Sequence, residues 1–249
     1  MNQRRDNDTA QMAGTKSGCR RAVLLDFDHT LFDTDRFFWV DLKSAFTQFG
    51  VSDDAWEKSY ETIWPSGYSL QKHLEALFRL GAIPSASIAS AMQEALEQTF
   101  SDLRPYLFPD VVVFLNAARR REFDLLLLSF GDPAWQSYKV RASGLTSYFT
   151  QIVYTPHEKG KADMLVTLAS TYAEIHVIDN NPADLDAMKT SIPRLHTYLI
   201  CRVEPSALEG ADPLVRDRFR EAARYLTIPS RLPHRQCRNL NEVPLPWPN

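Results

Sequence analysis

The sequence has few cysteines, no strong charge of either sign and no long apolar run. Its three cysteines, Cys19, Cys201 and Cys237, lie far apart and show no metal-ligand spacing, which excludes a disulfide framework or a zinc site as the basis of the fold. The longest aliphatic run covers residues 125–128, whereas a helix that crosses a bilayer needs roughly 20 apolar residues. We therefore expect a cytoplasmic protein in a reducing compartment, without a membrane partner.

The nearly equal numbers of acidic and basic residues also limit the classes of partner that the protein can attract. The formal net charge is −3 and the isoelectric point is near 6.1, so the chain has no general attraction for nucleic acid. With 249 residues, of which 44% are hydrophobic and 24% charged, it suits one large domain or a core with an inserted unit. Residues 1–18 are polar, lack the apolar segment of a secretion signal, and predict a flexible N-terminal tail.

The sequence is organised around residues 22–32, AVLLDFDHTLF. Its short apolar run predicts a strand buried on both faces, as at the centre of a parallel sheet. Asp26 then lies at the carboxyl end of this strand, where open α/β sheets bind their ligands. Asp28 follows two positions later, and two carboxylates this close repel each other unless a divalent metal or a shared proton lies between them.

Strands and helices alternate again after residue 105. Further buried strands are predicted at residues 124–130, 151–154, 175–179 and 196–201, the last of these ending the sheet, and helices at residues 111–121 and 161–172. Such alternation predicts an α/β fold with a doubly wound parallel sheet. We assign residues 19–32 and 105–202 to this core.

Residues 33–104, here called the helical insert, have apolar residues at helical spacing instead. Four helices are expected, and Gly50 and Gly81 are predicted to end two of them. The insert is dense in aromatic residues, which we expect to fill the interior of a helical bundle, with a few facing the cleft. Beyond it, residues 203–249 predict one amphipathic helix at 215–226 and then a proline-rich extension without regular structure, laid on the core.

Three predicted strands end in a residue that can act on phosphate or metal. Asp26, Ser129 and Asp179 are far apart in sequence, but the ends of parallel strands meet at one edge of the sheet. The Ser129 hydroxyl and the backbone N–H groups of Phe130 and Gly131 can hold phosphate oxygens. A lysine at a helix start, Lys161, adds the positive charge that a transferring phosphoryl group needs.

These motifs, in this order, resemble the haloacid dehalogenase superfamily of phosphatases and phosphotransferases. The sequences DFDHTLF, HEKGKADML and VIDNNPADL match its first, third and fourth motifs, and Ser129 stands where the second has serine or threonine. The resemblance covers roughly residues 21–201. It implies a Rossmann-like core and a helical cap between the first two motifs, formed by the helical insert.

The resemblance also implies a role for each residue. Asp26 is then the nucleophile, which forms an aspartyl phosphate, and Asp28 is the general acid and base. Mg²⁺ would be held by Asp26, the backbone carbonyl of Asp28 and Asp179. Ser129 and Lys161 would hold the remaining charge of a small phosphorylated substrate. Thr30 is expected to order the loop after the strand.

Several residues leave alternatives open. Either Lys159 or Lys161 can be the lysine of the third motif, and we prefer Lys161 because Leu165 then lies on the buried side of its helix. Asn180 stands where many relatives have a second aspartate. Asp184 is then a second acid of the site, or only a charge at a helix N-terminus.

The expected function is that of a magnesium-dependent phosphatase. Other reactions of the superfamily, phosphoryl transfer and dehalogenation, remain alternatives, as does a non-catalytic module that binds a phosphorylated ligand or a protein. Asp28 favours phosphoryl chemistry, because dehalogenases do not need a second acid. His29 is expected to be a polar loop residue, while His176 and His196 show no ligand spacing.

Overall fold

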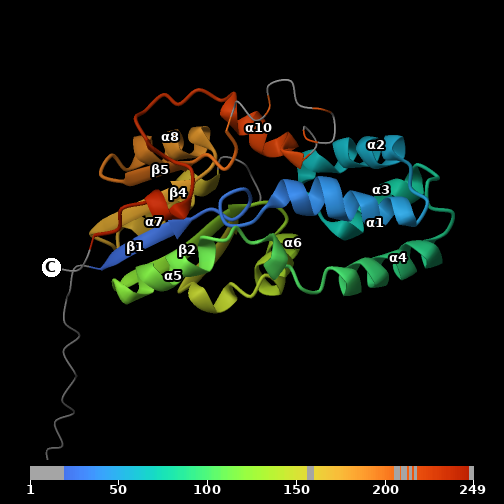
Figure 1. The fold of residues 1–249 in the computed structure, drawn as a ribbon, viewed down its shortest axis with the longest axis horizontal. Coiled ribbons are helices and arrows are strands. Elements are labelled where there is room, and N and C mark those ends of the chain that lie inside the picture. Colours follow the sequence, from blue (N-terminus) through green and yellow to red (C-terminus); the bar gives the residue numbers. More distant parts are fainter. Residues whose placement is uncertain are drawn as a thin grey trace, which may run out of the picture.

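The computed structural model describes residues 20–155, 160–204, 208, 212, 215 and 218–246. Figure 1 shows an elongated molecule, with a sheet and its helices at one end and the helical insert at the other. The predicted tail at residues 1–18 lies outside the described residues. The division of the chain into domains remains a prediction.

The core is a six-stranded sheet in which every neighbouring pair of strands is parallel. Its order is β3-β2-β1-β4-β5-β6, so the first strand lies near the centre, as its buried sequence predicts. The strands are β1 (Arg21–Leu25), β2 (Phe123–Phe130), β3 (Gln151–Thr155), β4 (Glu174–Asp179), β5 (His196–Ile200) and β6 (Arg235–Cys237).

The sixth strand corrects the expectation that the sheet ends near residue 201 and that the proline-rich extension has no regular structure. β6 is short and lies at the edge of the sheet, between Pro233 and Pro244 rather than across a proline. The pairing continues beyond β5, where the N–H of Cys201 donates to the carbonyl of Cys237 (2.9 Å). Prolines that flank an edge strand remove no N–H donor from the hydrogen bonds between the strands, so they do not prevent the strand from pairing.

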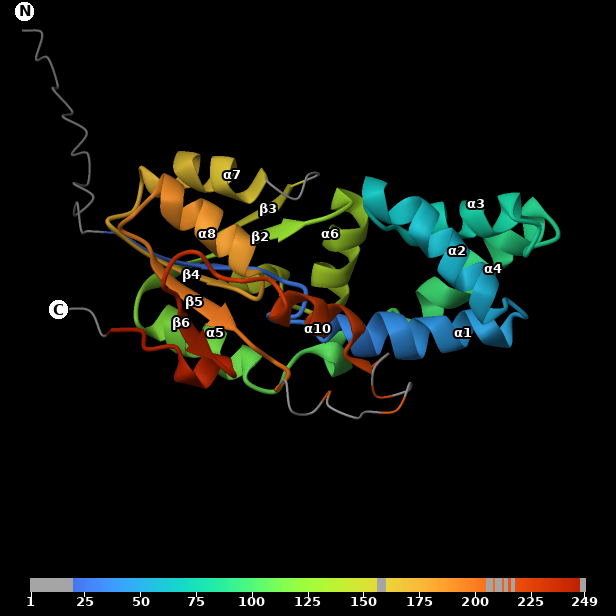
Figure 2. The same ribbon diagram turned by 90° about the horizontal axis from the view of Figure 1, so that it is seen from above.

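Helices cover both faces of the sheet, which confirms the doubly wound, Rossmann-like fold. Figure 2 shows α7 (Gly160–Ala169) and α8 (Pro182–Ser191) on one side and α5 (Val111–Arg120) on the other. Side chains alternate along β1, so Ala22 and Leu24 pack in the cluster of α7 and α8, and Val23 and Leu25 in that of α5. The remaining core helix is α6 (Pro133–Ala142), between the sheet and the insert.

The helical insert contains the four expected α-helices. They are α1 (Lys43–Gln48), α2 (Asp53–Ile63), α3 (Leu70–Arg79) and α4 (Ala86–Thr99). The π-helix η1 (Arg36–Leu42) and the short 3₁₀ helix η3 (Arg104–Tyr106) join them to the core, and a second 3₁₀ helix, η2 (Trp64–Ser66), lies between α2 and α3. Ser52, Ser69 and Ser85 cap α2, α3 and α4 by accepting a backbone N–H. Gly50 and Gly81 follow the ends of α1 and α3 with positive φ, as predicted.

The C-terminal segment connects the core to the insert. Its helix α10 (Arg220–Leu226) lies beside the junction of the two in Figures 1 and 2. Both oxygens of Asp35 accept its first N–H groups, those of Glu221 and Ala222 (2.9 Å each), and Arg218 forms a bidentate ion pair with Asp33. The proline-rich extension itself lies on the core, as expected, because β6 pairs with β5 and Leu240, Val243 and Leu245 pack in the core.

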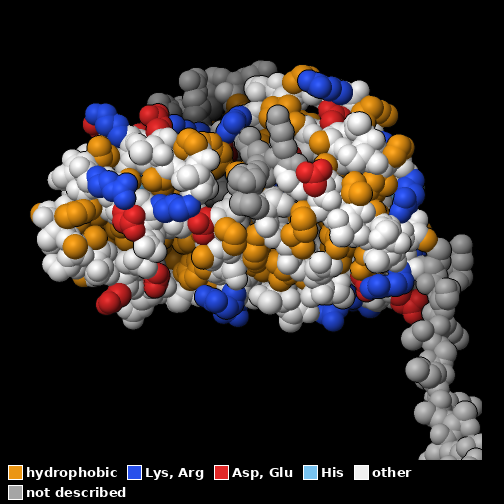
Figure 3. Space-filling view, turned by 180° about the vertical axis from the view of Figure 1, so that it is seen from behind, with side chains coloured by type: hydrophobic (Ala, Val, Ile, Leu, Met, Phe, Trp, Pro, Cys, Tyr) orange, Lys and Arg blue, Asp and Glu red, His pale blue; other side chains and the backbone are white. Residues whose placement is uncertain are grey.

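Charges of both signs are mixed on the surface. Figure 3 shows basic and acidic side chains interspersed with apolar ones over one face of the molecule, in keeping with the small net charge. Among the described residues, the helices are too short or too polar to cross a membrane.

The buried His73 makes the stability of the insert depend on pH. It bonds Ser59 (2.7 Å) and Tyr68 (3.2 Å), and burial lowers the pKa of its imidazole from 6.5 to about 3. Below pH 6.5 the unfolded chain therefore binds a proton that the folded protein excludes, so stability falls as the pH falls. Between pH 7 and pH 5, we expect a loss of up to about 2 kcal/mol from this group.

Urea unfolding of wild type and His73→Gln at both pH values measures this contribution. The variant should lose less stability than wild type on acidification. The control is His196→Gln, because His196 is exposed. An equal pH dependence in all three proteins would contradict the prediction.

Candidate active site

The site is built where β1 ends beside β4. The N–H of Asp26 donates to the carbonyl of Ile178 (3.0 Å), which extends the strand pairing by one residue. The chain then turns at once, because the N–H groups of Leu31 and Phe32 both donate to the carbonyl of Phe27 (2.9 and 3.0 Å). This tight turn keeps both acids of the first motif at the carboxyl edge of the sheet.

A buried lysine joins three carboxylates at this edge. Lys161, from the start of α7, lies 2.8 Å from Asp26, 2.8 Å from Asp179 and 3.2 Å from Asp184. The structure thus brings together four residues that the sequence predicts as site residues. Lys159 lies outside the described residues. Asp184 combines its two predicted roles, since it is in the first turn of α8 and also pairs with Lys161.

The charge of this cluster suits a divalent cation. Burial raises the pKa of Asp26, against the attraction of Lys161 and together with the repulsion of Asp179. Burial raises the pKa of Asp179 and Asp184 as well. One ammonium group does not balance three carboxylates, so a hard cation with oxygen ligands fits the site.

Asn180 and Thr30 both contact the predicted nucleophile. With its amide nitrogen turned toward these acceptors, Asn180 donates to Asp26 Oδ2 (3.3 Å) and to the backbone carbonyl of Asp28 (3.2 Å). The buried hydroxyl of Thr30 donates to Asp26 Oδ2 (3.3 Å). Thr30 therefore orients the side chain of Asp26, in addition to its expected part in the loop.

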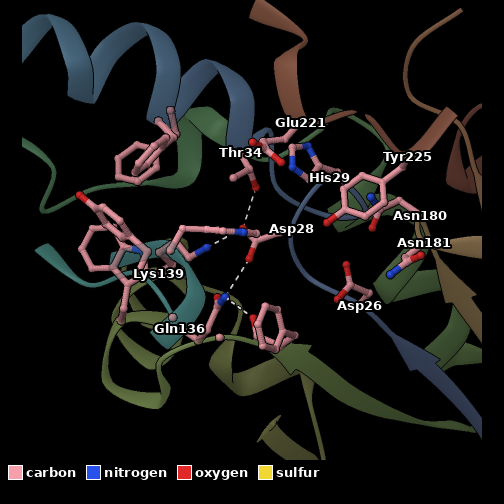
Figure 4. Close-up of a pocket in the computed structure, with 18 of the residues that line it drawn as sticks. Asp26, Asp28, His29, Thr34, Gln136, Lys139, Asn180, Asn181, Glu221 and Tyr225 are labelled. Carbon is pink, nitrogen blue, oxygen red and sulfur yellow. Dashed lines mark hydrogen bonds and ion pairs between the residues drawn. The ribbon is translucent and has the colours of Figure 1, made fainter. Parts of the chain in front are cut away.

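Asp28 is held by three donors on the other side of the cavity (Figure 4). Lys139 lies 2.5 Å from its Oδ1, Thr34 donates to the same oxygen (2.6 Å), and Gln136 donates to Oδ2 (2.8 Å). Burial raises the pKa of Asp28, but the ion pair with Lys139 and the three hydrogen bonds outweigh it, and the net pKa is lowered. In this arrangement Asp28 is a carboxylate, ready to accept a proton rather than to donate one.

These partners of Asp28 are not among the residues predicted from the sequence. One signal was available, since Asp132 and Pro133 directly follow β2 and form the N-terminus of α6, where the Asp132 side chain accepts two backbone N–H groups. Gln136 and Lys139 lie three residues apart on that helix and share one face. This face is the one turned toward Asp28.

The predicted phosphate-binding residues at the end of β2 differ in what they offer. Ser129 does not itself line the cavity, and its buried hydroxyl has no hydrogen-bond partner in the described part of the chain, so it is an unsatisfied group directly beside the lining. Phe130 and Gly131 line the cavity. The N–H of Gly131, however, donates to the carbonyl of Thr155 (3.0 Å). The expectation that this N–H is free for phosphate is therefore wrong.

Residues of the C-terminal segment complete the cavity. Glu221 and Tyr225 of α10 line it together with His29 and Asn181, and Figure 4 shows them around the edge that carries Asp26. His29, expected to be a polar loop residue, is buried with a positive φ of 59°. It lies 3.8 Å from Asp35, the residue that anchors α10.

A second cluster of possible ligands lies at the opposite end of β4. The ligand atoms of Glu174, His176 and His196 are within 4.8 Å of one another, which corrects the expectation that these histidines have no ligand geometry. His176, however, bonds Glu174 (2.7 Å) and Tyr198 (2.9 Å), so both of its ring nitrogens are satisfied without a metal.

The motifs on this edge match a known family along most of the chain. The family model described as haloacid dehalogenase-like hydrolase matches residues 20–191. The chain belongs to this family. No curated protein matches the sequence.

Solved structures with the same fold include hydrolases with different reactions. A putative haloacid dehalogenase-like hydrolase from Burkholderia xenovorans is 20% identical over 90% of this chain and 95% of that one (TM-score 0.64). The L-2-haloacid dehalogenase from Xanthobacter autotrophicus is 17% identical over 90% and 96% (0.55). A HAD phosphatase from Thermococcus onnurineus is 17% identical over 89% and 95% (0.54). At these identities, the likeness of the haloacid dehalogenase-like chain to each of them shows the fold alone.

Gly131 of this haloacid dehalogenase-like protein provides a test of the geometry around Asp28. Its φ is +136°, and a Cβ atom there would lie 2.6 Å from Nε2 of Gln136, the atom that donates to Asp28. Gly131→Ala should therefore destabilise the fold by about 1–3 kcal/mol and displace Gln136. Urea unfolding and a crystal structure of the variant measure both effects.

The matched control is Gly50→Ala. Gly50 also has a positive φ, but its Cβ would meet nothing within 4 Å. Gly50→Ala should therefore lose only the stability that corresponds to the strained backbone. If both variants lost equal stability and Gln136 kept its place, the close approach at Gly131 would have no consequence.

Proposed function

We propose that the protein is a magnesium-dependent phosphomonoesterase that acts on a small phosphorylated metabolite through an aspartyl phosphate. The observation that carries this proposal is the division between the two acids. Asp26 belongs to the cluster of Lys161, whereas Asp28 faces the same cavity from a separate set of donors. One acid for attack and a second for proton transfer is what hydrolysis of a phosphate ester in two steps requires.

Asp26 is the nucleophile in this proposal. Its carboxylate attacks phosphorus while the bond to the leaving oxygen breaks, and water then hydrolyses the aspartyl phosphate. Thr30 and Asn180 fix the carboxylate for attack. Lys161 and the Ser129 hydroxyl supply positive charge and a hydrogen bond to the phosphoryl oxygens.

Asp28 is suited to act as the base in the second step, because its contacts keep it ionised. In the first step the leaving oxygen needs a proton. Asp28 gives this proton in its protonated form, which the ion pair with Lys139 (2.5 Å) makes the less populated form. The attacking water returns a proton to Asp28 in the second step.

Mg²⁺ would be held by Asp26, the backbone carbonyl of Asp28 and Asp179. The unbalanced carboxylates around Lys161 support this assignment, and Asn180 and Asp184 lie beside it. When bound, the ion would neutralise part of the phosphate charge.

Dehalogenation is the second candidate. The L-2-haloacid dehalogenase of similar fold carries chloropropionic acid covalently bound, and the cavity of this protein has an extensive apolar lining. Asp28 with its donors, and the excess of buried carboxylates, favour the phosphatase. Phosphate release from p-nitrophenyl phosphate, compared with chloride release from 2-chloropropionate, separates the two activities from each other and from a non-catalytic binding module.

We further propose that the enzyme works in the cytoplasm, without nucleic acid or membrane partners. The two described cysteines, Cys201 and Cys237, are free thiols, as expected in a reducing compartment.

Removal of divalent metal should abolish phosphate release. Treatment with EDTA and gel filtration should reduce turnover of p-nitrophenyl phosphate at least a hundredfold, and added Mg²⁺ should restore it. Asp179→Asn should need more Mg²⁺ for half-maximal activity, whereas Asp163→Asn, an exposed acid of α7, should not. Full turnover with metal loss verified by elemental analysis would rule out the metal requirement.

The two acids should fail in different ways when replaced. Asp26→Asn should abolish both turnover and the covalent adduct, because no other group can attack in line. Asp28→Asn should reduce turnover on the order of a hundredfold or more, but should still form the adduct with an aryl phosphate, whose leaving group needs little protonation.

Rapid quench with labelled p-nitrophenyl phosphate, followed by peptide mapping, detects the adduct directly. Asp163→Asn serves again as the control. An adduct on a residue other than Asp26, or wild-type turnover by Asp26→Asn, would overturn the mechanism.

A further inference from the structure

The wall of the cavity opposite the acids is almost entirely aromatic. Seven aromatic residues of the insert and α6 form this wall, and they are Phe37, Phe38, Trp39, Tyr60, Trp64, Tyr68 and Trp135. Phe130 and Tyr225 also line the cavity but lie outside this wall. From the sequence, most of the insert aromatics are expected to fill the interior of a helical bundle, with a few facing the cleft. Phe37, Phe38, Trp39, Tyr60 and Tyr68 are buried in the core, as expected, and they also line the cavity that contains Asp26 and Asp28.

These rings form a continuous network. Phe38 lies 4.7 Å from Tyr68 and 5.2 Å from Tyr60, measured between ring centroids. Tyr68 continues to Trp135 at 5.3 Å, and Tyr60 to Trp64 at 5.7 Å. Such packing fixes the rings in place, so the wall is a preformed apolar surface and a flat group can stack on it without reordering side chains.

The described lining offers no unpaired cation for a second anionic group. Its lysines are Lys139 and Lys161, and each is already paired with carboxylates, Lys139 at 2.5 Å and Lys161 at 2.8–3.2 Å. A second phosphate or a carboxylate on the leaving group would therefore lose its hydration against an aromatic wall without gaining an ion pair.

We infer that the leaving group of the substrate carries a flat apolar ring and no further negative charge. This inference rests on the proposed phosphatase function. In this inference, the aromatic wall is the part of the cavity that selects the leaving group.

A series of phosphate esters tests this assignment. 2-Phenylethyl phosphate and glycerol 1-phosphate are both esters of primary alcohols, so they differ little in intrinsic leaving ability. We expect kcat/KM to be at least tenfold higher for 2-phenylethyl phosphate, from burial of the ring. Phosphoglycolate, which adds a carboxylate, should be the poorest of the three. Acetyl phosphate, small and activated, reports phosphatase activity independently of the wall.

Trp64→Ala removes a half-buried ring from the wall, and Phe78→Ala is its matched control. Phe78 also belongs to the insert and is 44% exposed, but it does not line the cavity. The ratio of kcat/KM for 2-phenylethyl phosphate to that for glycerol 1-phosphate should fall at least fivefold in Trp64→Ala and stay constant in Phe78→Ala.

Binding measured by calorimetry covers the case in which Trp64→Ala does not fold. Wild-type protein should bind 2-phenylethylphosphonate at least tenfold more tightly than methylphosphonate. Two outcomes would overturn the inference without contradicting the proposed phosphatase function. One is hydrolysis of acetyl phosphate without a preference for the aromatic ester, and the other is equal binding of the two phosphonates. Failure to hydrolyse any of the esters with Mg²⁺ present would overturn the proposed function itself.

Discussion

The ion cluster around Lys161 is the interaction on which the rest of the site depends. Three carboxylates from β1, β4 and α8 meet at one ammonium group from α7. Removing any one of these charged groups would leave the others buried with fewer opposite charges. Breaking a buried ion pair in this way lowers the stability of the fold by several kcal/mol. The same contacts therefore hold two strands and two helices in register and keep Asp26 in position.

This arrangement separates two kinds of electrostatic environment within one cavity. Around Lys161 the acids outnumber the base, which raises the pKa of Asp26 through burial and repulsion. Around Asp28 a single acid meets Lys139, Gln136 and Thr34, and its net pKa falls despite burial. The pKa values of two aspartates only two residues apart thus shift in opposite directions, because the two side chains have different neighbours at the sheet edge.

The core of the fold could be predicted because its signals are local. A run such as residues 22–25 is apolar on both faces only when it lies inside a sheet, and the ends of such runs indicate where Asp26, Ser129 and Asp179 meet. The contacts of Asp28 could not be predicted in this way. Lys139 is 111 residues away, and an ion pair between two elements leaves no periodic pattern in either. β6 was missed because the prolines around it outweigh a three-residue edge strand in any local interpretation.

The attachment of α10 has a consequence for how the cavity can open. The helical insert is continuous with the core at two points, near Asp33 and Arg104, and a hinge rotation would pivot there. Arg218 binds Asp33 and the first N–H groups of α10 bind Asp35, so the C-terminal segment bridges the first of these pivots. A hinge motion of the insert must carry α10 along or break these contacts. Any opening of the cavity by such a motion would therefore depend on the last fifth of the chain, which contains none of the four motifs.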